Sequence, residues 1–301
     1  MADDELIPPR EERTIPVAAD RVLGIAEFGP ADGRPIFWFH GTPGAKRQVP
    51  PAARRAADEL GVRVIGVERP GTGQSTGHLY RHIRDFADDL TVVADTLELD
   101  RFGLIGLSGG GPYTLACAHE LPDRVVAAVV LGGVAPTVGD ETAGGGPADL
   151  TRIFRHPLVL SRWGLGVLAT TLARALRPFG RQGLALYAWL APEGDKIAFA
   201  SPGMATMFLD DLNTAAAHGG LHAATADLVL FGRSWGFAVA DISVPVRFWH
   251  GDADPIVPLA HAEHLAALVP DAELHVRPGE SHLGTLVVGD EALRTVVGLW
   301  R

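Results

Sequence analysis

The chain has 301 residues, of which 47% are apolar and 21% charged, with 36 glycines and 22 prolines. This composition is typical of a globular protein and excludes a coiled coil, a collagen and a disordered chain. The formal net charge of −10 argues against nucleic-acid binding, which needs a basic surface, and favours a small molecule as the partner.

The N-terminal residues 1–13 carry five acidic side chains and no apolar stretch, unlike a secretory signal or a transit peptide. The longest uncharged apolar run, 125–135, has eleven residues, about half of what a membrane-spanning helix needs. The single cysteine, Cys117, excludes an internal disulfide and suits a reducing compartment. We therefore expect a cytoplasmic protein without a transmembrane segment, and the sequence indicates no oligomeric state.

Apolar runs alternate with helical patterns along the first 135 residues. Short strands are predicted at 14–19 and 21–28, followed by buried strands at 35–40, 62–67, 102–107 and 125–131. Apolar residues recur every three or four positions at 46–60, 81–99 and 112–121, which predicts helices between the strands. Unbroken apolar strands separated by helices indicate an α/β fold with a mostly parallel sheet that is covered on both faces.

The alternation stops near residue 135. From 136 to about 241 the chain reads as short helices broken at prolines 157, 178, 192 and 202. The pattern then resumes with a strand at 244–250, a helix at 259–268, a strand at 272–277 and a closing helix at 283–300. We predict an α/β core formed by residues 1–135 and 242–301, with a helical cap inserted at 136–241.

A serine flanked by glycines follows the third buried strand. Residues 106–110, Gly-Leu-Ser-Gly-Gly, fit the pattern G-x-S-x-G between a predicted strand and a predicted helix. Such a turn holds the serine in a strained conformation with its hydroxyl exposed, and the helix N-terminus offers N–H groups to a developing oxyanion. Ser108 is therefore the candidate nucleophile.

A serine nucleophile needs a base, and the base needs a carboxylate that fixes its tautomer. His282, in the loop between the last predicted strand and the last helix, is the candidate base. Asp254 is the candidate acid, because it follows the strand at 244–250 and precedes Pro255, which favours an extended conformation. Asp252 follows the same strand and is expected to hold the turn through backbone N–H groups.

The order Ser108, Asp254, His282 resembles that of the α/β-hydrolase family, in its capped serine esterase and proline-iminopeptidase-like branch. Three further motifs agree with the family in order: HGTPG at 40–44, ERPGTGQS at 68–75, and G-x-x-D-x-x-x-P at 251–258. The resemblance extends from residue 35 to residue 300. It implies an α/β-hydrolase fold with catalytic Ser108, Asp254 and His282.

The resemblance also implies an oxyanion hole made by the backbone N–H groups of Thr42 and Gly109. His40 and Gly41 then shape the loop that carries Thr42. The family usually has aspartate where this chain has Glu68, and we expect the turn to accommodate the longer side chain. No metal and no organic cofactor is implied.

Other histidines and the cysteine receive no chemical role. His261 and His264 share a helix face without further metal ligands, so we expect a surface helix. His218 and His222 have i, i+4 spacing but lack the glutamate of a zinc-protease helix, and we assign the spacing to chance. Cys117 is expected to be a small buried hydrophobe.

The segment 151–181 holds six arginines and no acidic residue. A solvated helix face explains this composition, and the alternative is attraction of an anionic substrate or of a membrane surface carrying a lipidic ester. The large apolar side chains of the cap are expected to form its packing core or to line a pocket over Ser108. They are Phe154, Trp163, Tyr187, Trp189, Met204, Met207, Phe208, Trp235 and Phe237.

The candidate residues predict a serine hydrolase that cleaves a carboxylic ester, with amide, thioester and lactone bonds open to the same chemistry. The alternative is a proline-iminopeptidase-like aminopeptidase, in which acidic residues such as Glu193, Asp210 or Asp211 would face Ser108 to bind a free amino group. Two further alternatives are cofactor-free haloperoxidase or perhydrolase activity and, from a different class, a ligand receptor with little turnover.

Overall fold

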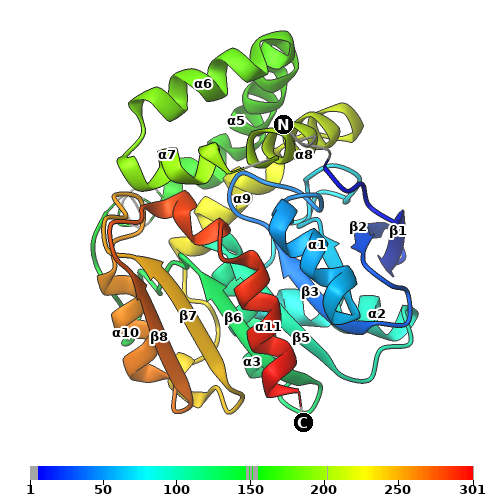
Figure 1. Ribbon diagram of the computed structural model, residues 1–301, viewed down its shortest axis with the longest axis vertical. Coiled ribbons are helices and arrows are strands. Elements are labelled where there is room, and N and C mark those ends of the chain that lie inside the picture. Colours follow the sequence, from blue (N-terminus) through cyan, green and yellow to red (C-terminus); the bar gives the residue numbers. More distant parts are fainter. Residues whose placement is uncertain (1–5, 147–148, 150, 152–154, 202, 301) are drawn as a thin grey trace.

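The structure, a computed structural model, is a sheet covered by helices on both faces with a helical cap above one edge (Figure 1). It describes residues 6–146, 149, 151, 155–201 and 203–300. The eight strands follow the order β1-β2-β4-β3-β5-β6-β7-β8. Strand β2 is antiparallel to both of its neighbours, and the other pairs are parallel. The predicted α/β architecture with a mostly parallel sheet is confirmed.

The strands lie close to their predicted positions, although the first begins three residues earlier than expected and β7 begins two residues later. Their bounds are β1 Glu11–Ala18, β2 Arg21–Phe28, β3 Arg34–Phe39, β4 Val62–Val67, β5 Phe102–Leu107, β6 Val125–Leu131, β7 Val246–Gly251 and β8 Ala272–Arg277.

Five helices cover the two faces of the sheet. Helices α1 (Pro51–Leu60) and α11 (Gly289–Leu299) cover one face, and α2 (Phe86–Thr96), α3 (Gly111–Glu120) and α10 (Ala260–Leu268) cover the other (Figure 1). Alternate side chains of β3 join the two resulting cores, with Ile36 and Trp38 in one and Phe37 and Phe39 in the other. Because both faces are buried, the parallel strands are apolar along their whole length.

Three predicted helices are shorter or interrupted. The helix expected at 46–60 begins only at Pro51, because Pro51 holds the preceding residue extended and is itself suited to the first helical position. The stretch at 81–99 contains a 3-10 turn, η1 (Ile83–Asp85), before α2. The closing stretch likewise divides into η5 (His282–Leu286) and α11.

Between β6 and β7 the described residues form helices and turns: α5 Arg155–Leu176, η3 Arg177–Phe179, α6 Gly180–Leu190, α7 Glu193–Ala200, α8 Met204–His218, α9 His222–Phe231 and η4 Val239–Asp241. The expectation of short helices is wrong for α5, which has 22 residues. Pro157 lies in its first turn, where a proline is tolerated. Pro178 and Pro192 do lie at helix boundaries, and Pro202 lies outside the described residues.

The carboxyl ends of the parallel strands all lie on the side of the sheet that faces the cap (Figure 1). The loops that follow β3, β4, β5, β7 and β8 therefore meet there, which brings together residues far apart in the sequence. In the part of the chain that the structure describes, no helix is long and apolar enough to cross a membrane.

Candidate active site

Ser108 stands at the end of β5, where the chain turns through η2 (Ser108–Gly110) into α3. Its backbone φ is +49°, in the left-handed region that side chains rarely adopt, as expected for a sharp strand-to-helix turn. A Cβ at Gly106 would overlap the Thr114 hydroxyl, so the close approach of β5 and α3 requires glycine at this position. The turn leaves the Ser108 side chain partly exposed beneath the cap.

The side chains of Ser108, His282 and Asp254 form one hydrogen-bonded line. The Ser108 hydroxyl donates to His282 Nε2 at 2.8 Å, and His282 Nδ1–H donates to Asp254 Oδ2 at 2.7 Å. His282 opens η5 after β8, and Asp254 follows β7. The structure therefore brings together the three residues that the sequence singled out, in the geometry that general base catalysis needs.

Asp254 is buried and its carboxylate is fully engaged. Its other oxygen, Oδ1, accepts the N–H groups of Ile256 at 2.8 Å and Val257 at 2.9 Å. Burial alone would raise the pKa of Asp254, but hydrogen bonds from His250 and His282 outweigh it and hold the pKa below its usual range. The group is therefore ionised near neutral pH and can stabilise a positive charge on His282.

Asp252 points to a different partner. Its carboxylate accepts the N–H of Gly279 at 2.7 Å and so joins the turn after β7 to the turn after β8. The expected turn-holding contact is present, although it reaches the neighbouring loop. No described contact joins Asp252 to His282.

His40 shapes the loop that follows β3. Its Nδ1–H donates to the Gly41 carbonyl at 2.7 Å, and its Nε2 accepts the N–H of Arg69 at 3.2 Å. Burial, together with the charge of Arg69, holds the pKa of His40 well below its usual value. The ring is therefore neutral, as this donor and acceptor pattern requires.

Thr42 and Gly109 lie against each other at the end of the sheet. A Cβ at Gly109 would overlap the Thr42 hydroxyl, so only glycine permits this approach. Thr42 belongs to the loop after β3, and Gly109 directly follows Ser108 in the turn after β5.

A carboxylate of the cap, Asp227 on α9, is buried beside the Thr42 loop. It accepts hydrogen bonds from the hydroxyl groups of Thr42 at 2.6 Å and Tyr113 at 2.7 Å. The Arg69 guanidinium binds it at 2.7–3.1 Å and also donates to the carbonyl groups of the two residues before Thr42. This buried ion pair therefore ties the cap to the loop that carries Thr42.

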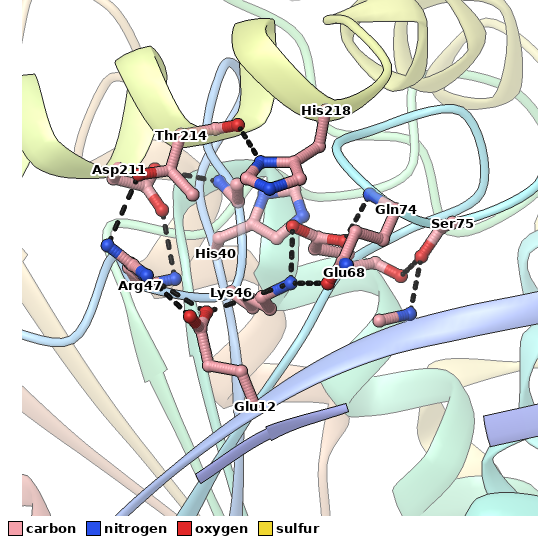
Figure 2. Close-up of polar contacts among 12 residues, drawn as sticks. Glu12, His40, Lys46, Arg47, Glu68, Gln74, Ser75, Asp211, Thr214 and His218 are labelled. Atoms are coloured by element: carbon pink, nitrogen blue, oxygen red, sulfur yellow. Dashed lines mark hydrogen bonds and ion pairs between the residues drawn. The ribbon is translucent and has the colours of Figure 1, made fainter. Parts of the chain in front are cut away.

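Two more buried cap carboxylates bind loops of the core. Asp211, on α8, accepts the N–H groups of Ala45 at 2.8 Å and Arg47 at 2.9 Å, just beyond the Thr42 loop (Figure 2). Asp195, on α7, accepts the N–H of Leu283 at 2.7 Å, next to the candidate histidine. Three cap helices are thus each anchored to a loop that carries or adjoins a candidate catalytic residue.

Glu68 is accommodated by a buried polar cluster (Figure 2). Its carboxylate lies 3.4 Å from Lys46 Nζ and accepts the N–H of Gln74 at 2.8 Å. A Cβ at Gly24 or at Gly73 would overlap the Glu68 side chain, so these glycines leave the room that glutamate needs. Burial raises the pKa of Glu68, although Lys46 and the Gln74 N–H oppose the shift.

The acidic cap residues considered for amino-group binding have other partners. Glu193 is exposed and pairs with Lys196 at 3.0 Å. Asp210 pairs with Arg47 at 2.9 Å, and Asp211 binds the backbone groups already described. None of these contacts involves Ser108.

Several expectations about histidines and aromatic residues need correction. His261 is buried, where a surface position was expected, because its ring accepts the Ala135 N–H and contacts the Gly145 carbonyl. Trp163, Tyr187 and Trp189 are exposed and so do not form the packing core of the cap.

Other side chains that were expected to be buried are buried in the structure, and one further side chain lies outside the described residues. Met204, Met207 and Trp235 are buried as expected, and Phe154 lies outside the described residues. Cys117 is buried, and burial raises the pKa of its thiol well above the usual value. Among the described residues, no group of three or more His, Cys, Asp or Glu side chains could hold a metal ion.

Sequence reasoning did not identify Asp195, Asp211 or Asp227 as anchors of the loops that carry or adjoin the candidate residues. It also missed His250, whose Nε2 lies 3.4 Å from Asp254 and donates to the Val257 carbonyl at 2.6 Å. The available signal for His250 was its place at the end of a buried strand, four residues before Asp254.

Residues 34–287 match the family model of the alpha/beta hydrolase fold. A non-heme haloperoxidase of Rhodococcus erythropolis is 29% identical over 83% of this chain and 86% of that protein. A probable proline iminopeptidase of Leptolyngbya boryana is 28% identical over 42% of this chain and 40% of that protein. An esterase of Thermogutta terrifontis, solved with malate bound, has a similar structure with a TM-score of 0.67 and 20% identity, covering 97% and 100% of the two chains.

Proposed function

Because the chain belongs to the alpha/beta hydrolase fold family, we propose that it is a serine hydrolase that cleaves a carboxylic ester of a small to medium apolar molecule. The observation that carries this proposal is the line of hydrogen bonds from Ser108 through His282 to Asp254, at 2.8 and 2.7 Å. The three hydrogen-bonded residues determine the type of reaction, whereas the cap determines which substrate is bound.

In the proposed mechanism, Ser108 attacks the ester carbonyl carbon while His282 Nε2 takes the hydroxyl proton. The N–H groups of Thr42 and Gly109 stabilise the tetrahedral oxyanion, and His282 then protonates the departing alkoxide. The same ring next takes a proton from water, which attacks the acyl-enzyme, and it then returns this proton to the Ser108 oxygen as the acid is released. Asp254 holds the imidazole in the required tautomer throughout and stabilises its charge.

We also propose that residues 136–241 act as a cap over a core of residues 1–135 and 242–301. The buried contacts of Asp195, Asp211 and Asp227 support this arrangement, because they join the cap to the loops that carry or adjoin the proposed catalytic residues. A cap that moved as a free lid would expose these carboxylates at each opening.

The aminopeptidase alternative has less support, because Glu193, Asp210 and Asp211 pair with groups other than Ser108. The haloperoxidase relative favours a second activity on the same acyl-enzyme. In that reaction hydrogen peroxide replaces water as the attacking group, and a peracid leaves instead of the acid.

The proposal is tested with a series of p-nitrophenyl esters from acetate to palmitate, run beside prolyl and alanyl anilides. We expect ester hydrolysis by the wild type, and a loss of kcat on the order of 10⁶ in Ser108→Ala. Ser234→Ala changes an exposed serine and is the matched control, with unchanged kinetics. Adding hydrogen peroxide should produce peracid in the wild type but not in Ser108→Ala.

Two results would contradict the proposal. Preferred cleavage of anilides would favour the aminopeptidase, and full activity of Ser108→Ala would remove the nucleophile. A chelator should leave the activity unchanged, so inactivation by EDTA with rescue by zinc would reopen the assignment of the histidine pairs.

A further inference from the structure

The cap exposes an apolar surface that the proposed mechanism does not use. Among the described residues, 13 of the 17 exposed large apolar side chains lie between positions 160 and 197, including Leu160 at 87% exposure and Trp189 at 74%. Soluble monomers rarely expose a concentration of this kind unless it is an interaction site. The 13 are Leu160, Trp163, Leu165, Val167, Leu168, Leu172, Leu176, Phe179, Leu186, Tyr187, Trp189, Leu190 and Ile197.

The exposed side chains follow the surfaces of two helices. Leu165, Leu168, Leu172 and Leu176 recur every three or four residues and therefore form one stripe along α5. On α6, Leu186 and Leu190 have the same spacing. Helix α6 lies at the top of the cap, at the end of the molecule opposite the sheet (Figure 1). Helices α7, α8 and α9 instead carry the three carboxylates that bind the core.

The same segment is strongly cationic within an acidic protein. Residues 160–190, which hold all of these apolar side chains except Ile197, contain four arginines and no acidic residue, so the rest of the chain carries a formal charge of −14. Arg177 and Arg181 are exposed where α5 passes into α6, on either side of the exposed Phe179. Exposed cationic and apolar groups therefore alternate along α5, η3 and α6, and we call the exposed side chains of residues 160–190 the α5–α6 surface.

The α5–α6 surface could bind a second copy of this chain or an anionic bilayer. Its cationic and apolar groups together favour the bilayer. A second copy that paired symmetrically would place the α5–α6 surface against itself, with arginines near arginines and no acidic partner within the segment. An anionic bilayer instead offers phosphate groups to the guanidinium groups and an acyl boundary to the leucines. Tryptophan and tyrosine are also favoured at that interface.

We propose that the α5–α6 surface docks this protein on an anionic lipid bilayer, with the exposed apolar side chains entering the headgroup region and Arg177 and Arg181 binding lipid phosphates. The docking does not depend on Ser108 or on ester hydrolysis. The cap would then lie between the bilayer and the core.

Vesicle flotation of the full chain tests this proposal, with equimolar phosphatidylcholine and phosphatidylglycerol compared with phosphatidylcholine alone. We expect the protein to float with the anionic vesicles and to be released by high salt, which screens the charges. Removing both charges in Arg177→Gln/Arg181→Gln should weaken binding about 25-fold, at about fivefold for each arginine. The double variant Trp189→Glu/Leu190→Glu should weaken it by at least about tenfold.

Matched controls change similar groups elsewhere. Val92→Glu alters an exposed apolar side chain of α2, and Arg55→Gln removes an exposed charge of α1, and neither should change flotation. The melting temperature of each variant shows whether it remains folded. Ser108→Ala should float like the wild type, so a failure of the hydrolase proposal would leave this result unaffected.

Three results would overturn the proposal. The first is absence of binding to anionic vesicles at low salt, and the second is binding that the α5–α6 substitutions do not weaken. The third is a stable dimer, measured by light scattering, that Trp189→Glu/Leu190→Glu dissociates, because the surface would then bind a second copy.

Discussion

Replacing Asp227 by asparagine removes the negative charge that the cap places beside the Thr42 loop, with little change in shape. The wild-type carboxylate binds the buried Arg69 guanidinium at 2.7–3.1 Å and accepts the hydroxyl groups of Thr42 and Tyr113. In Asp227→Asn, the guanidinium keeps its burial but loses its charged partner. We expect the variant to be less stable than the wild type, and we expect Thr42 to be displaced.

The size of each effect follows from these contacts. Breaking a buried ion pair by removing one partner costs about 3–5 kcal/mol, which corresponds to a fall in Tm of roughly 5–8 °C for a protein of this size. If the Thr42 N–H then no longer points at the oxyanion, kcat should fall by about 10²–10³, as after loss of one oxyanion-hole donor. KM should change much less, because the oxyanion forms only after the substrate has bound.

The assay combines thermal unfolding with kcat and KM for a p-nitrophenyl ester, measured well below the Tm of the variant. Tyr113→Phe is the matched control, because it removes one hydrogen bond from an uncharged donor to the same carboxylate and leaves the ion pair in place. It should cost about 1.5–3 kcal/mol and leave kcat within about tenfold of the wild type. A boronic acid that occupies the oxyanion hole should bind Asp227→Asn more weakly, in parallel with the loss of kcat.

Wild-type stability and wild-type kcat in Asp227→Asn would show that the carboxylate neither stabilises the fold nor positions Thr42. A lower Tm with unchanged kcat and unchanged boronic acid affinity would show that Asp227 supports the fold alone and does not position Thr42.

Three further predictions concern the candidate site and its anchors. Asp254→Asn should lower kcat by roughly 10⁴ in a folded protein, whereas Asp252→Asn should lower mainly the Tm, and the reverse pattern would transfer the acid role to Asp252. Gly109→Ala should lower kcat by at least about 10², because its methyl group would push the Thr42 hydroxyl aside, so kinetics like those of the wild type would argue against this oxyanion hole. Burial raises the pKa of Asp211 to about 7, so its contribution to stability is fully present below about pH 4 and is lost as the pH rises through about 7. Asp211→Asn should remove up to about 4 kcal/mol of this fall, seen in Tm measured from pH 4 to pH 8, and an unchanged Tm profile would contradict the raised pKa.

The placement of Ser108, Asp254 and His282 was predictable because each follows a strand at a turn marked by glycine or proline. The carboxyl ends of parallel strands meet at one edge, so strand prediction alone brings these three residues close together. The distinction between Asp252 and Asp254 also followed from local sequence, through Pro255.

The cap was much less predictable, because no strand fixes the position of its helices. Asp227 and Asp211 bind groups 185 and 166 residues away in the sequence, and nothing near either residue indicates those partners. Trp163 and Trp189 were expected inside the cap, yet helices with apolar residues around much of their circumference do not reveal which face is buried. The long α5 was missed because a proline in a first turn gives the same signal as a helix break.

In the proposed mechanism, Ser108 is the nucleophile and His282 activates it. The most direct test of these roles is labelling of the intact protein with a fluorophosphonate, followed by peptide mass spectrometry to locate the adduct. We expect one adduct, on the peptide that contains Ser108, no labelling of Ser108→Ala, and greatly slowed labelling of His282→Ala. An adduct on any other serine, or equal labelling of Ser108→Ala, would contradict this mechanism.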